Sequence, residues 1–162
     1  MSERYAASIR IGGEIKQPDL ARLLDAITKA SVFCHWGEPP FEPKSAEELA
    51  VAARDGHLFL CDEQTRDGEF PELETACREL GLSYTRWSEG FCSYDAEVVE
   101  WRPCMNEPAA FVGSNAGDAT FVPADEVRKA LKHLESNHIG RARQLLSKLC
   151  PDIPKLPPFT IV

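Results

Sequence analysis

Residues 70–88, FPELETACRELGLSYTRWS, constrain the fold most, because they specify a helix, a stop and a strand in direct succession. Pro71 suits the first helical turn, where its missing N–H would have no partner, and Gly81 suits the left-handed residue that ends a helix. We therefore predict a helix from Phe70 to about Leu80, followed by a strand over 82–88. Apolar residues recur at helical spacing along one stripe, namely Phe70, Leu73, Ala76, Cys77 and Leu80.

Further strands are indicated by alternation or by short apolar runs. Residues 5–11 alternate, and Gly12-Gly13 is expected to end or bend that strand. Residues 57–61 are continuously apolar, which is typical of a strand covered on both faces and central in its sheet. The remaining predicted strands are 82–88 with 96–102, as one antiparallel pair, and 109–112 with 119–122, as a smaller hairpin.

The other helices are predicted from apolar spacing and caps. Leu20, Leu23, Leu24 and Ile27 follow the i, i+3, i+4, i+7 pattern. Ser45 and Glu48 form a capping box that opens a short helix. Two amphipathic helices are expected near the C-terminus, at 125–149 with a break at about 136.

These elements predict an α+β fold: a single mixed or mainly antiparallel sheet of four to six strands with helices packed on one or both faces. We expect residues 1–162 to form a single domain, and 104–108 is the best position for a sub-boundary. Residues 151–162 contain four prolines and are expected to form an extended, Pro-rich tail.

No apolar run approaches the ~20 residues that span a bilayer, so no membrane association is expected. The N-terminus MSERYAAS does not continue into the apolar segment of a secretory signal, and a cytoplasmic location is the expectation. Reduced thiols are expected in such a chain. The six cysteines are at positions 34, 61, 77, 92, 104 and 150.

The net charge of −8 is unevenly distributed along the chain. Residues 128–162 hold seven Lys/Arg and two acidic residues, a balance of +5, so the remainder carries −13. An acidic body repels phosphates and attracts basic surfaces. The sequence therefore favours a basic protein partner over nucleic acid for the body of the molecule.

Arg86, Trp87, Trp101 and Arg102 are the most distinctive combination of polar and aromatic residues. Their two strands are expected to pair, which would bring these residues into one patch. Trp and Arg are the residue types that anchor protein interfaces. We take them as candidate interface residues, with the alternative that the tryptophans are core residues and the arginines lie on the surface.

Nucleic-acid binding and catalysis receive less support from the sequence. The helices of 125–149 carry Arg141 and Arg143, which offer an alternative as a nucleic-acid-binding protein acting through 128–148. A second alternative is a small enzyme that uses Cys34 or a carboxylate pair. Zinc spacings, phosphate-binding glycine motifs and the nucleophile elbow are absent from the sequence, so no catalytic residue, metal ligand or cofactor is predicted.

The pattern F-x-x-L-E-x-x-C-x-x-x-G-L-x-Y-x-R-W-S-x-G at 70–90, with S-I-x-I-G-G at 8–13, resembles a group of small proteins from bacterial plasmids and prophages. The resemblance covers about the first 100 residues, and the group has no assigned activity. It implies a mobile genetic element as the setting and favours host-interaction or inhibitor roles. The residues shared with the pattern include Phe70, Leu73, Glu74, Cys77, Gly81, Arg86 and Ser88.

These observations lead to a non-enzymatic protein-interaction module as the expected function. Its most concrete form is an acidic protein from a mobile element that binds or inhibits a basic, nucleic-acid-handling host protein.

Overall fold

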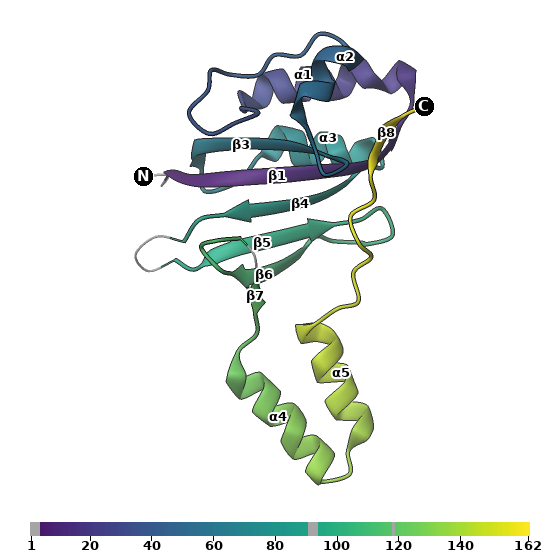
Figure 1. The fold of residues 1–162 in the computed structure, drawn as a ribbon. Helices are drawn as coiled ribbons and strands as arrows, with labels where there is room; N and C mark the ends of the chain where they lie inside the picture. The colour runs from purple at the N-terminus through teal and green to yellow at the C-terminus, as the bar shows by residue number, and fades with distance from the viewer. Residues whose placement is uncertain (1–3, 91–93, 118) are drawn as a thin grey trace.

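The computed structural model describes residues 4–90, 94–117 and 119–162, and shows an α+β fold built on one open sheet (Figure 1). The sheet has eight strands in the order β2-β3-β1-β4-β5-β6-β7, with β8 pairing β1 outside this path. Neighbouring strands are antiparallel except for the β1–β8 pair, which is parallel. The strands are β1 (Arg4–Ile15), β2 (Ala53–Arg54), β3 (His57–Arg66), β4 (Ser83–Ser88), β5 (Ala96–Trp101), β6 (Ala109–Gly113), β7 (Thr120–Phe121) and β8 (Phe159–Ile161).

The α+β class and the mainly antiparallel sheet are confirmed, but the predicted size of four to six strands is too small. The predicted hairpin forms as β6 and β7, and the additional strands β2 and β8 contain two and three residues. Strands this short leave no alternation to detect, and the place of β8 is set by pairing with β1, which is distant in the chain. The first strand is also longer than predicted, since it continues through Gly12 and Gly13 to Ile15.

One face of the sheet carries the hydrophobic core. Alternate residues of the central strands point to this face, such as Ile9, Ile11, Leu60 and Tyr84, and all of them are fully buried. The apolar stripes of α1 and α3 pack onto them. The helical elements are η1 (Gln17–Asp19), α1 (Leu20–Ala30), α2 (Ala46–Leu49), η2 (Ala50–Ala52), α3 (Pro71–Glu79), α4 (Ala124–Glu135) and α5 (Ile139–Leu149).

The expected caps and turns form. The Ser45 side chain accepts a hydrogen bond from the Glu48 amide, which caps α2 as expected, and the Glu48 carboxylate accepts one from Lys44 N, one residue before the amide used in a standard capping box. Gly81 follows α3 with φ +69°, the left-handed conformation that glycine adopts at low cost. Residues 58–61 are buried as expected, but β3 is not central, because it lies beside the two-residue edge strand β2.

The C-terminal part leaves the sheet and returns to it. In Figure 1, α4 and α5 project beyond the β7 edge, away from α1, α2 and α3, and the two helices pack against each other. The extended tail then runs back along the molecule, and β8 adds to β1. β5 and β6 pair directly with each other, so the sheet continues across the suggested sub-boundary at 104–108.

Candidate functional site

The structure separates the four residues that the sequence suggests as one patch. Arg86, Trp101 and Arg102 are buried, and only Trp87 is partly exposed. The reason is the two-residue alternation of a strand, which places Arg86 and Trp87 on opposite faces of β4. Arg86 faces the helices together with Trp101, so these two side chains are not available to a partner protein.

Arg86 links the sheet to α3. Its guanidinium donates to the Gly68 carbonyl at 2.6 Å and to Glu97 Oε1 at 2.8 Å. Its Nε lies 3.0 Å from Glu74 Oε1 in an ion pair. The Glu74 carboxylate also accepts from Phe70 N and Tyr84 Oη, both at 3.2 Å. Arg86 is therefore a structural residue, whose buried charge is paired and hydrogen-bonded as such a charge requires.

Arg102 joins the C-terminal tail to the sheet. Its Nε donates to the Pro154 carbonyl at 2.8 Å, and its Nη1 donates to the carbonyls of Tyr84 and Trp101 at 2.7 and 2.8 Å. Burial lowers the pKa of the Arg102 guanidinium, and the Glu100 carboxylate opposes this effect. The side chain is thus occupied by three backbone carbonyls and does not form an interface anchor.

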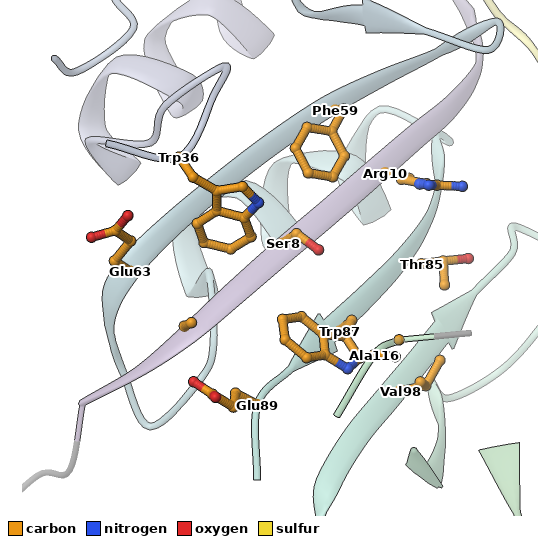
Figure 2. Close-up of a pocket in the computed structure, with 12 residues that line it drawn as sticks. Ser8, Arg10, Trp36, Phe59, Glu63, Thr85, Trp87, Glu89, Val98 and Ala116 are labelled. Carbon is orange, nitrogen blue, oxygen red and sulfur yellow. The ribbon is translucent and has the colours of Figure 1, made fainter. Parts of the chain in front are cut away.

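The face of the sheet opposite α1 and α3 is the candidate site, and we call it the open face. It contains a concavity of about 740 Å³, which lies in the size range of ligand pockets. The strands β3, β1 and β4 form its floor, with one wall from the loop before α2 and another from the loop after β6 (Figure 2). The lining residues are Ala6, Ser8, Arg10, Trp36, Phe59, Glu63, Thr85, Trp87, Glu89, Val98, Ala116 and Gly117.

Strand register arranges the floor of the open face along β1. Ser8 pairs with Trp87 on one side, and Arg10 pairs with Phe59 and Thr85 on its two sides. Small Ser8 thus lies between two tall aromatic walls, with Trp36 on the opposite side from Trp87 (Figure 2). Trp87 stands on β4 and Trp36 comes from the loop before α2, so the small Ser8 side chain leaves a slot between them for an apolar group.

Polarity changes along the same slot. Glu63 and Glu89 lie on either side of the start of β1, and the Glu89 amide donates to the Ala6 carbonyl at 2.8 Å. Arg10 lies further along the strand, beyond the tryptophans (Figure 2). Glu63, Glu89 and Arg10 are exposed, and none of the three forms an ion pair with another described residue. The open face therefore has an acidic end, an aromatic middle and a cationic end.

Two sets of contacts fix the aromatic walls. Trp87 Nε1 donates to the Ser114 carbonyl at 2.9 Å, and Gly117 lies so close to the indole that an added Cβ would be 3.3 Å from it. On the other side, Arg54 stacks over the Phe59 ring at 4.3 Å and donates to the Cys34 carbonyl at 2.7 Å. Arg54 thereby holds the loop from which Trp36, itself 43% exposed, reaches over the sheet.

The second exposed surface is the helical hairpin, residues 124–149. Ala130 and Ala142 are buried where the two helices meet, and their small side chains allow a close approach. Among the described residues, seven of the eleven exposed large hydrophobic side chains lie between residues 112 and 146, so this part of the molecule has an incompletely covered apolar surface. They are Val112, Phe121, Val122, Leu131, Leu134, Ile139 and Leu146.

The helical hairpin is also basic. It holds six Lys/Arg and three acidic residues, a net charge of +3, which leaves −11 on the rest of the chain. Arg128 and Lys129 are paired within α4, with Asp125 and Glu126. The candidate nucleic-acid residues Arg141 and Arg143 are exposed on α5, and Arg143 borders a shallow groove lined by Leu134, Ile139 and Leu146.

The cysteine expected for an enzymatic alternative is poorly placed for nucleophilic chemistry. Cys34 is buried, and desolvation, with a smaller contribution from Glu38, raises the pKa of its thiol. Burial likewise raises the pKa of Cys61 to about 11. Among the described residues, there is no group of three or more His, Cys, Asp or Glu side chains that could hold a metal ion. Cys92 lies outside the described residues.

These thiol environments predict an order of labelling. We expect iodoacetamide at pH 8 to modify the exposed Cys104 and Cys150 first, with Cys34, Cys61 and Cys77 reacting only after denaturation. Site-resolved mass spectrometry over a time course measures this order. Rapid modification of Cys34 in the folded protein would contradict the placement of its thiol and revive the enzymatic alternative.

Sequence reasoning identifies Trp87 but misses Arg10, Trp36, Glu63 and Glu89. A signal for Arg10 was present, since the alternation of residues 5–11 places Ser8 and Arg10 on one face. Trp36 lies in the irregular segment between α1 and α2, where no periodic pattern indicates which way its side chain points.

Comparison of the chain with protein-family models, with curated proteins and with solved structures finds no match. In the described part of the chain, helices that could cross a membrane are not found.

Proposed function

We propose that the protein is a non-enzymatic protein-interaction module that binds a basic, partly apolar segment of a partner protein on its open face. The single observation that supports this most is the order of side chains along β1, with Glu63 and Glu89 at one end of a slot between Trp36 and Trp87. Aromatic faces attract cations and also bury apolar groups, while unpaired carboxylates at the same end favour ammonium or guanidinium groups.

The charge of the molecule supports the same choice of partner. Outside the helical hairpin the chain carries −11, and a field of this sign steers basic segments towards the surface. The cationic Arg10 at the opposite end of the slot gives the segment a direction, because it disfavours a second cluster of positive charge there. The proposed partner is thus a segment with one or two cationic residues next to a bulky apolar residue.

Nucleic acid fits the open face less well. Aromatic residues on a sheet can stack bases, but phosphates need cationic neighbours. Of the described residues that line the concavity, Arg10 is the one cation, whereas two are carboxylates. The alternative through the helical hairpin depends on Arg141 and Arg143, and a gel shift with both changed to Glu tests it: loss of DNA or RNA binding would favour that alternative.

A basic, nucleic-acid-handling host protein stays the proposed class of natural partner. The support is the acidic body and the resemblance at 70–90 to plasmid and prophage proteins. An inhibitor role would follow if the bound segment were one that the partner needs for contact with its own nucleic acid.

The direct test uses a ten-residue peptide with an Arg-Leu-Arg core between Gly/Ser spacers, titrated while tryptophan fluorescence is followed. We expect saturable binding that weakens steeply between low and high salt, because exposed charges are screened. A Glu63→Gln/Glu89→Gln variant is expected to bind about tenfold more weakly or worse. The matched control is the same peptide with Glu-Leu-Glu. Equal affinity for both peptides, or unchanged affinity in the variant, would overturn the proposal.

A further inference from the structure

Two surfaces of this chain leave apolar or aromatic side chains exposed that globular proteins usually bury. The open face is a concave sheet surface with two tryptophans and two carboxylates that form no ion pair with another described residue. The helical hairpin is a two-helix projection with exposed Leu131, Leu134 and Ile139 and a net charge of +3. A lone pair of helices leaves one apolar side without a partner, whereas helices packed on a sheet bury it.

We infer that the helical hairpin of one copy of this chain docks on the open face of a second copy. The inference rests on the proposed function, because it assigns the same face to a basic and partly apolar segment, here supplied by the chain itself. The observation that carries it is complementarity within one sequence. The helical hairpin projects from the sheet (Figure 1) with exposed apolar side chains and a net charge of +3, and the open face is a concavity with an aromatic middle and an acidic end (Figure 2).

The apolar and basic residues at the end of the helical hairpin are arranged in the same order as the aromatic and acidic residues along the slot. Leu134 and Ile139 flank the connection between α4 and α5, and they are 44% and 60% exposed. Arg141 and Arg143 follow within one turn of Ile139. With Leu134 and Ile139 between the tryptophans, the two arginines lie within reach of the acidic end. The 11 or 12 residues of each helix span about 17 Å, comparable to the six residues of β4 at about 20 Å.

The chain cannot easily make this contact with its own open face. The tail after α5 is fixed by Arg102 Nε to the Pro154 carbonyl at 2.8 Å, by Gly13 N to Pro158 O at 3.1 Å and by the β1–β8 pairing. The segment before α4 is fixed by β7 at the edge of the sheet. Held at both ends, the helical hairpin points away from its own sheet (Figure 1), which favours docking on a second molecule.

Two such contacts related by a twofold axis close a dimer and leave no free surface for further growth. The dimer would cover the open face until a partner segment displaces the hairpin. Self-association therefore competes with the Arg-Leu-Arg peptide, and the two equilibria are linked.

The test is sedimentation equilibrium over a range of protein concentrations and salt. We expect the wild type to move from 18.0 kDa to twice that mass as concentration rises, with a dissociation constant that increases with salt. Arg141→Glu/Arg143→Glu and Glu63→Arg/Glu89→Arg are each expected to weaken the dimer roughly a hundredfold, because both place like charges together. The Lys16→Glu/Lys29→Glu variant changes the net charge as Arg141→Glu/Arg143→Glu does, but Lys29 is in α1 on the opposite face and Lys16 follows the end of β1, so this variant should dimerise as the wild type does.

Charge exchange gives the more decisive result. A chain with all four substitutions regains complementary charges and is expected to dimerise as the wild type does, although each pair of substitutions alone weakens the dimer. Far-ultraviolet circular dichroism verifies that every variant is folded. A wild type that stays at 18.0 kDa throughout, a dimer that survives Arg141→Glu/Arg143→Glu, or four substitutions that fail to restore it would each overturn the inference.

The outcomes distinguish this inference from the proposed function. A monomeric wild type that still binds the Arg-Leu-Arg peptide overturns the dimer and leaves the peptide site standing. A dimer whose Arg141→Glu/Arg143→Glu monomer fails to bind the peptide overturns the proposed function alone. If both hold, that monomer binds the peptide more tightly than the wild type, because its open face is free.

Discussion

The Arg86→Ala variant is expected to lose about 3–5 kcal/mol of its free energy of unfolding, the usual effect of removing one partner from a buried ion pair. Arg86 is 3% exposed and contacts Glu74, Glu97 and the Gly68 carbonyl. Its removal leaves the largely buried Glu74 charge without its main cation and leaves a cavity beneath α3. Urea denaturation followed by circular dichroism measures the loss.

The control for this prediction is another arginine on the same sheet. Arg10 is on the neighbouring strand and points to the open face, where it is exposed and forms no ion pair with a described residue. Arg10→Ala is therefore expected to change the free energy of unfolding by no more than about 0.5 kcal/mol. Equal effects of the two substitutions would show that Arg86 is not the structural link between β4 and α3.

Gly12→Ala is expected to destabilise the protein by about 1–3 kcal/mol and to release the C-terminal tail. A Cβ on Gly12 would lie 1.9 Å from the Pro157 carbonyl oxygen, a backbone atom that cannot rotate away. The tail must then move, which breaks the adjacent hydrogen bond from Gly13 N to Pro158 O and disturbs the β1–β8 pairing. Limited proteolysis of residues 151–162, combined with urea denaturation, measures both effects.

Gly140→Ala provides the matched comparison. Gly140 is in α5, and an added Cβ would meet nothing within 4 Å. Alanine is the better helix former, so this variant is expected to be as stable as the wild type or up to about 1 kcal/mol more stable. If both glycine variants kept an intact, protease-resistant tail, the close crossing of the tail over Gly12 would be contradicted.

Most helices and strands could be predicted from the sequence, because they depend on interactions between residues close together in the chain. The stripe of α3, the stop at Gly81, the cap at Ser45 and the pairing of β4 with β5 all depend on residues close together in the chain. Two strands were missed: β2 is only two residues long and pairs with the adjacent β3, whereas β8 depends on the distant β1 and lies in a tail whose four prolines show no strand pattern. This is why the sheet is larger than predicted.

The candidate site was harder to predict for the same reason. The alternation of side chains along a strand predicts that Arg86 and Trp87 face opposite ways, but it does not predict which face of the sheet the helices cover. That choice buries Arg86 and brings Trp87 to the open face, next to Ser8 from a strand 79 positions earlier in the chain. Trp36 arrives from an irregular loop whose path is fixed by the contact of Arg54 with the Cys34 carbonyl, which sequence spacing does not reveal.

The most direct test of the proposed binding site uses the three indole N–H signals of the protein in a two-dimensional ¹⁵N NMR spectrum, recorded as the Arg-Leu-Arg peptide is added. Trp36 and Trp87 line the open face, whereas Trp101 is buried on the opposite face of the sheet. Trp→Phe variants assign the three signals. We predict that the Trp36 and Trp87 signals shift together to saturation while that of Trp101 stays in place. Peptide binding that leaves the Trp36 and Trp87 signals unmoved would contradict it.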